Sequence, residues 1–126
     1  MKEWLNRLDE LYPDMQEWRR YLHQYPELSY MESETASFVA DRLRSWGIEP
    51  SMNVGGHGVV ANIEGGKPGP TVALRADMDA LPIQDEKTCA YRSKIDGVMH
   101  ACGHDGHTST LLGIARALQE HRGELP

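Results

Sequence analysis

The sequence has few cysteines, no long apolar run and no cluster of basic residues, and each absence excludes a class of protein. Its two cysteines, Cys89 and Cys102, form no Cys-x-x-Cys pair. This argues against a thiol redox protein and favours free thiols or a metal ligand in a reducing compartment. No apolar stretch approaches the length of a membrane span, and the N-terminus lacks the apolar core of a signal peptide. The formal net charge of -6, without a basic face, argues against nucleic acid as a partner.

What is present is the composition of an ordinary globular protein. Hydrophobic residues make up 40% and charged residues 25% of the chain. A length of 126 residues is enough for one domain with a real core. Without a signal for export or for membrane insertion, the predicted location is the cytoplasm, and no membrane partner is expected.

Apolar residues recur every three or four positions in three stretches, which predict three helical regions. The first covers about residues 2–24, where Pro13 predicts either two helices or one kinked helix. The second covers about residues 33–46. The third begins at Asp105 as its N-cap, and Gly113 within it predicts close packing against a strand.

Three segments have the composition of strands, namely residues 48–54, 58–63 and 71–76. The last is nearly all apolar, as expected for a strand that is covered on both faces. Glycines and prolines in residues 65–70 predict a hairpin between the last two strands, so the sheet should be mixed. Residues 83–97 show no sustained period and predict a long loop over the site. The predicted fold class is therefore α/β, with helices flanking a mixed sheet.

Residues with metal-binding chemistry gather in residues 98–108, which hold three of the six histidines and one of the two cysteines. Imidazole and thiolate are the usual ligands of zinc and of other borderline metals. Cys102 and His104, two positions apart in extended backbone, can face one pocket, whereas His100 and His107 need not. The competing interpretation is a polar loop that enters a helix, with surface histidines and a buried neutral cysteine.

Further candidate side chains lie outside this run. Asp77 and Asp79 follow the third predicted strand at i and i+2, so they project to one side if the backbone stays extended. Open α/β sheets place ligand sites at such strand ends, where these carboxylates could bind metal or orient a ligand imidazole. A turn or helix-capping pair is the alternative. His23 is predicted to be structural, either capping a helix or facing solvent, and contact with a site is the alternative.

Four segments of the chain, in order, carry the pattern of a known family. They are Arg19-Arg20-Tyr21-Leu22-His23, then Pro26-Glu27-Leu28-Ser29, then residues 69–82 with Arg75-Ala76-Asp77-Met78-Asp79-Ala80-Leu81-Pro82, and residues 97–108 around His100-Ala101-Cys102-Gly103-His104-Asp105. This pattern resembles the M20 metallopeptidase family, specifically its amidohydrolase branch of N-acyl-amino-acid amidohydrolases, hippurate hydrolases and auxin-conjugate hydrolases. The resemblance implies a zinc-peptidase-like catalytic domain of three-layer type.

The resemblance also implies a chemistry and a site. The enzyme would hydrolyse the amide bond of N-acyl amino acids with metal-activated water, using two divalent metal ions per complete site. Zinc or manganese is expected, with nickel and cobalt also open. Cys102 and His104 would be metal ligands. Asp77 and Asp79 would be the catalytic candidates: Asp79 matches a supporting aspartate, and Asp77 departs from the pattern where other branches carry a histidine.

Members of this family are much longer, and their general base and remaining ligands lie outside the matching segments. Residues 1–126 are therefore expected to be the N-terminal part of an M20-like catalytic domain, without the inserted lid or dimerisation domain. We expect this chain alone to be inactive or nearly so, and its unpaired sheet edge to favour self-association or a homo-oligomer. The alternative is a non-catalytic metal-binding or interaction module that needs a partner chain.

Overall fold

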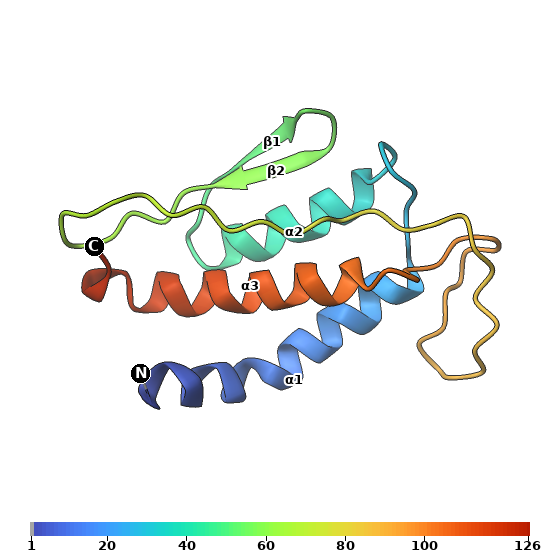
Figure 1. Cartoon of the computed structure of the whole chain (residues 1–126), viewed down its shortest axis with the longest axis horizontal. Coiled ribbons are helices and arrows are strands. Elements are labelled where there is room, and N and C mark those ends of the chain that lie inside the picture. The colour runs from blue at the N-terminus through green and yellow to red at the C-terminus, as the bar shows by residue number, and fades with distance from the viewer. Residues whose placement is uncertain (1) are drawn as a thin grey trace.

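The computed structural model describes residues 2–126 and contains three long helices, a short hairpin and extended connections (Figure 1). The helices are α1 (Lys2–Gln24), α2 (Ser33–Ser45) and α3 (His104–Glu120), and a 3-10 turn, η1 (Arg122–Glu124), follows α3. The strands are β1 (Pro50–Val54) and β2 (Gly58–Ala61). These elements confirm the α/β class, with helices beside a small sheet. In the described part of the chain, no helix combines the length and the apolar character needed to cross a membrane.

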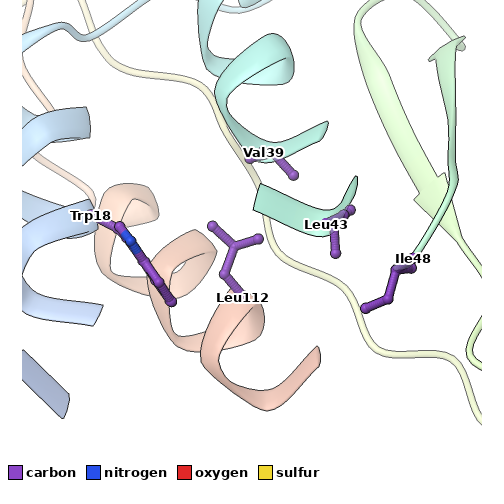
Figure 2. Packing of buried hydrophobic residues seen from close by; sticks show 5 residues of the cluster. All are labelled: Trp18, Val39, Leu43, Ile48 and Leu112. Atoms are coloured by element: carbon purple, nitrogen blue, oxygen red, sulfur yellow. The ribbon is translucent and has the colours of Figure 1, made fainter. Parts of the chain in front are cut away.

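The hydrophobic core lies where the three helices meet, with α3 between α1 and α2 (Figure 1). Figure 2 shows its central cluster, to which every helix contributes. Its members are Trp18 from α1, Val39 and Leu43 from α2, Leu112 from α3, and Ile48 from the connection to β1. Each such side chain, fully buried, contributes about 1.5–3 kcal/mol relative to an exposed one. The helical periodicity of the sequence therefore identified the faces that form the core.

One continuous helix, α1, passes through Pro13 and lies against α3. Its axis changes direction part-way along (Figure 1), which agrees with the predicted kinked helix rather than with two helices. Two sets of ion pairs attach it to α3. The Arg7 guanidinium contacts the Glu120 carboxylate at 2.6 Å, and Arg116 contacts Asp14 at 2.9 Å. The hydrogen bonds from Arg7 hold the pKa of Glu120 below its usual value.

The sheet is a hairpin of β1 and β2, which pair antiparallel with Pro50 opposite Ala61. The chain reverses at residues 55–57. Gly55 and Gly56 have φ angles of 63° and 113°, which glycine adopts without the steric penalty of a Cβ atom. Residues 55–57 therefore make the hairpin turn, earlier in the chain than the hairpin predicted at residues 65–70.

The predicted third strand at residues 71–76 is wrong. Its backbone is extended and, in the view of Figure 1, crosses α2 and runs in the same direction as the axis of α3. Within residues 2–126, however, the sheet holds only β1 and β2, so this segment pairs with no strand. Val72 and Leu74 are accordingly 77% and 56% exposed. An apolar pattern predicts extended backbone, but a strand also needs a neighbour, and β2, the neighbour predicted for it, pairs with β1.

The predicted hairpin turn at residues 65–70 is also wrong, because the segment that follows it pairs with no strand of the described chain. This segment lies against the C-terminal residues, where backbone hydrogen bonds hold it. The N–H groups of Gly66 and Lys67 donate to the carbonyls of Arg122 and Leu125 at 2.8 and 3.0 Å. The turn-forming residues therefore change the direction of the chain here. The hydrogen bonds to residues 122–125 fix the path that the backbone takes.

Gly113 allows α3 to approach α1 closely. The prediction that Gly113 packs against a strand is therefore wrong. A Cβ atom at Gly113 would collide with the Met15 side chain of α1. Glycine inside a helix costs about 1 kcal/mol relative to alanine. That cost is offset here by the close approach of the two helices.

We predict that Gly113→Val lowers the free energy of unfolding by about 1–3 kcal/mol, because the added side chain overpacks the α1–α3 contact. Denaturant titration measures the change. Gly106→Val is the matched control for the poor helix propensity of valine, since a Cβ at Gly106 meets open space in the same helix. Combining Gly113→Val with Met15→Ala should cost less than the sum of the single changes. Strict additivity would contradict the proposed contact.

Candidate metal centre

The two predicted ligands lie on either side of the start of α3. Cys102 belongs to the loop that precedes the helix, and its side chain is exposed. His104 is the first helical residue, so the predicted start at Asp105 is one residue late and Asp105 is not the N-cap. Gly103 occupies the N-cap position with a φ of 87°, a left-handed conformation that favours glycine. This turn places the thiol and the imidazole at the same end of α3.

Asp79 fixes the ring of His104. The Nδ1 atom of His104 lies 2.9 Å from the carboxylate oxygen of Asp79 and 3.0 Å from its carbonyl oxygen. Both neighbours can only accept a hydrogen bond, so Nδ1 carries the hydrogen and donates it. In the neutral ring the lone pair then lies on Nε2. A carboxylate that holds one nitrogen in this way is the usual support of a metal-binding histidine.

Short backbone contacts on both sides hold the segment that carries Asp79. Ala80 forms a parallel bridge with Leu28, and Leu81 forms an antiparallel bridge with Met99. The N–H groups of Leu81 and Met99 donate to each other's carbonyls at 3.0 Å. The carboxylate of Asp79 therefore sits on backbone that is tied both to the loop after α1 and to the loop before α3.

Asp77 makes different contacts from Asp79. Its carboxylate lies 2.6 Å from the guanidinium of Arg75, whose side chain is exposed, whereas that of Asp77 is partly buried. Its carbonyl accepts a hydrogen bond from the Thr108 hydroxyl of α3 at 2.9 Å. The contacts thus join Asp79 to His104, whereas Asp77 anchors the end of the extended segment to α3.

A buried cluster of charged side chains lies next to the ligand loop, centred on Asp105, which is 1% exposed. One carboxylate oxygen of Asp105 lies 2.6 Å from Nδ1 of His23 and 3.0 Å from Nε of Arg19. The other accepts a hydrogen bond from the Gly106 N–H at 2.9 Å. Asp105 therefore links the first turn of α3 to the last turn of α1.

Asp85 brings the long loop of residues 82–98 into the same cluster. Its carboxylate lies 2.8 Å from the Lys87 ammonium, accepts a hydrogen bond from the Ser93 N–H at 2.8 Å, and lies 3.4 Å from Nε2 of His23. Burial alone would raise the pKa of Asp85, but the hydrogen bonds from Lys87 and Ser93 outweigh it and hold that pKa well below its usual range. The predicted loop is thus confirmed, and it folds around an ionised carboxylate.

His100 lies beside this cluster and is 5% exposed. Its ring centre is 6.5 Å from that of His23. Neither ring nitrogen has a hydrogen-bond partner among the described residues. Burial lowers the pKa of His100, and the nearby Asp105 carboxylate only partly offsets this, which favours the neutral ring.

The donor chemistry of Cys102 and His104 fits a borderline divalent metal, but the pair alone is a small ligand set. Across residues 2–126, no three side chains of the His, Cys, Asp and Glu types form a metal-binding group. Both cysteines are free thiols in the described chain. Since even a catalytic zinc normally has three protein ligands, these residues can supply part of a site rather than a closed one.

The sequence reasoning missed the roles of His23, Asp85 and Asp105. His23 is buried at 2% exposure, so the predicted capping or solvent-facing position is wrong. One signal was available, because Arg19 and His23 are four residues apart and share a face of α1. Their partner, however, lies 82 positions beyond His23, where no periodic pattern connects the two.

Comparison with known proteins finds relatives that match nearly the whole chain. Residues 73–126 match the model of peptidase family M20/M25/M40. The protein YhaA of Bacillus subtilis is 59% identical over 124 residues, which cover 98% of this chain and 31% of YhaA. The chain belongs to the M20 family. An N-acyl-L-amino acid amidohydrolase of Geobacillus stearothermophilus is 50% identical over 98% of this chain and 34% of the enzyme.

The solved structures agree with this membership. The YxeP protein of Bacillus subtilis, described as a dinuclear metal-binding peptidase of the M20 family, superposes with a TM-score of 0.87. It is 42% identical, and the match covers 93% of this chain and 33% of YxeP. In each of these comparisons the chain spans about a third of the length of the relative that it matches.

We predict that acid removes the stabilisation that Asp85 provides. Its pKa is lower in the folded chain than the ordinary 3.8, so the unfolded state binds more protons. The stabilisation is therefore present above about pH 4 and is lost as the pH falls below that value. Asp85→Asn should lower the free energy of unfolding at pH 7 by about 1.5–3 kcal/mol, as expected for hydrogen bonds to a charged group.

Chemical denaturation at a series of pH values measures both effects. The Asp85→Asn variant should show a flatter dependence of stability on pH in the acid range than the parent chain. Asp96→Asn changes an exposed carboxylate of the same loop and serves as the control. Identical acid profiles for Asp85→Asn and the parent chain would contradict the assignment.

Proposed function

We propose that this chain supplies the ligands Cys102 and His104 to the divalent metal centre of an amidohydrolase that cleaves N-acyl amino acids. The observation that carries the proposal is the contact between His104 and Asp79, which holds Nδ1 and leaves Nε2 of the ring free to bind a metal, two positions from Cys102 in the chain. The Geobacillus relative, an N-acyl-L-amino acid amidohydrolase, supports the substrate class. The dinuclear metal of YxeP supports two ions per complete site.

Each residue has a separate task in this proposal. Cys102 and His104 bind the metal, for which zinc or manganese are the first candidates. A bound divalent ion polarises an amide carbonyl and lowers the pKa of a bound water toward about 7. Asp79 keeps Nδ1 of His104 protonated and the ring in place. Asp77 positions the segment that carries Asp79 through its carbonyl bond to Thr108.

We further propose that residues 1–126 act as the N-terminal part of a larger catalytic domain. Two ligands leave the metal incompletely bound, so the chain alone should be inactive or nearly so. The exposed apolar residues Val72 and Leu74 lie on extended backbone that pairs with no strand of the described chain. Such a segment favours strand pairing with further polypeptide or, without it, self-association.

The same exposed segment favours a second candidate, an interaction module without catalysis. In that case Val72 and Leu74 would contact a partner chain, and the metal pair would serve structure alone. The two candidates differ in whether Cys102 and His104 are needed for hydrolysis once the missing ligands are supplied.

Cobalt(II) titration tests the ligand pair directly. The parent chain should develop the charge-transfer absorption of a cobalt–thiolate bond, and Cys102→Ser should abolish it. Cys89→Ser is the matched control and should leave the absorption intact, because Cys89 lies in the long loop and is not one of the two proposed ligands. Asp79→Asn should weaken cobalt binding about 10-fold to 100-fold, as expected for loss of a ligand's support. Equal spectra for Cys102→Ser and the parent chain would contradict the ligand assignment.

A chimera tests the reaction. We expect the Geobacillus amidohydrolase to keep hydrolysing an N-acetyl amino acid when its matching segment is replaced by this chain, because the two are 50% identical there. Introducing Cys102→Ser or His104→Asn into the chimera should reduce turnover at least 100-fold, whereas Cys89→Ser should not. A chimera that binds metal and hydrolyses nothing would favour the interaction module.

A further inference from the structure

The start of α3 is held from outside the helix. The N-cap residue of α3 is Gly103, which has no side chain to cap the helix and imposes little restraint on its own backbone. The residue after His104 is Asp105, whose carboxylate binds the last turn of α1. Figure 1 shows the N-terminal end of α3 beside the C-terminal end of α1. The position of His104 therefore depends on a contact made by its neighbour.

His23 provides the shorter of the two side-chain contacts from α1. Its Nδ1 lies 2.6 Å from Asp105, against 3.0 Å for Nε of Arg19. Its other nitrogen, Nε2, faces Asp85 at 3.4 Å, a distance of charge contact rather than of a good hydrogen bond. One buried imidazole thus joins α1, the first turn of α3 and the long loop.

We propose that His23 is a positioning residue for the metal ligands, acting through Asp105. With Asp79 holding the His104 ring on one side and His23 holding the following residue on the other, the first turn of α3 has one orientation relative to Cys102. Loss of the His23–Asp105 contact leaves Asp105 buried with fewer partners, and the turn rearranges at Gly103 to hydrate it. This inference rests on the proposed metal site.

Two substitutions of His23 separate its two contacts. In His23→Asn the side-chain amide nitrogen takes about the place of Nδ1, so a donor to Asp105 is kept and the contact with Asp85 is lost. In His23→Gln the amide nitrogen reaches about the place of Nε2, so the contact with Asp85 is kept and that with Asp105 is lost. Both variants remove the ring, so a role in packing alone would affect them alike.

The first readout needs no metal. Long-range proton–nitrogen NMR spectra of the imidazole rings report which nitrogen of His104 carries the hydrogen. We expect the parent chain and His23→Asn to show His104 protonated at Nδ1, and His23→Gln to show a mixture of tautomers. The second readout is cobalt(II) affinity, which we expect to fall about tenfold in His23→Gln and to stay within about threefold of the parent in His23→Asn.

Each outcome decides the inference. Equal His104 spectra in His23→Gln and His23→Asn overturn it, whatever the cobalt result. A parent chain that binds no cobalt contradicts the proposed metal site, while the NMR comparison still decides the role of His23. If neither His23 variant folds, Arg19→Met replaces them, since that side chain is about one-third exposed and touches the same oxygen of Asp105. It should shift the His104 spectrum in the same direction, and an unchanged spectrum would overturn the inference.

Discussion

The buried carboxylate of Asp105 is the interaction on which the arrangement of this chain depends. Removing an ionised carboxylate from water costs several kcal/mol unless charges and hydrogen bonds replace the water. Here His23, Arg19 and the Gly106 N–H supply them. Since the first two lie on α1 and the third on α3, the carboxylate can be satisfied only when the two helices meet at this end. The requirement selects one relative placement among those that apolar packing alone would allow.

The same principle organises the part of the chain that has little regular structure. Between β2 and α3 the backbone forms no sheet within the described residues, yet it follows a definite path. Asp85 accepts hydrogen bonds from the Lys87 and Ser93 N–H groups and so closes the long loop on itself. The bridges of Ala80 and Leu81 tie the preceding segment to the loops on either side. Buried polar groups, rather than a sheet, therefore place Asp79 next to His104.

The candidate metal site inherits its geometry from these contacts. His104 receives its ring orientation from Asp79 and its place in the fold from Asp105, and both supports lie outside the ligand pair itself. The small ligand set and the exposed extended segment agree with the proposal that further polypeptide completes the domain in a protein of the relatives' length. Supports of this kind belong to the chain whether or not a metal is bound, which makes them accessible to direct measurement.

The sequence by itself determined the three helices, the family and the candidate ligands, because periodicity and the motif around Cys102 are local properties of neighbouring residues. It also indicated that residues 71–76 are extended and that Gly113 marks a close approach. Only the tertiary structure decided what those features contact. Gly113 meets Met15 of α1, and residues 71–76 pair with no strand of the described chain. It likewise decided that Asp105 and His23 form a buried pair rather than a cap and a surface residue. The physical reason is that burial and pairing of charges depend on contacts between residues far apart in the chain, and a local pattern carries no record of them.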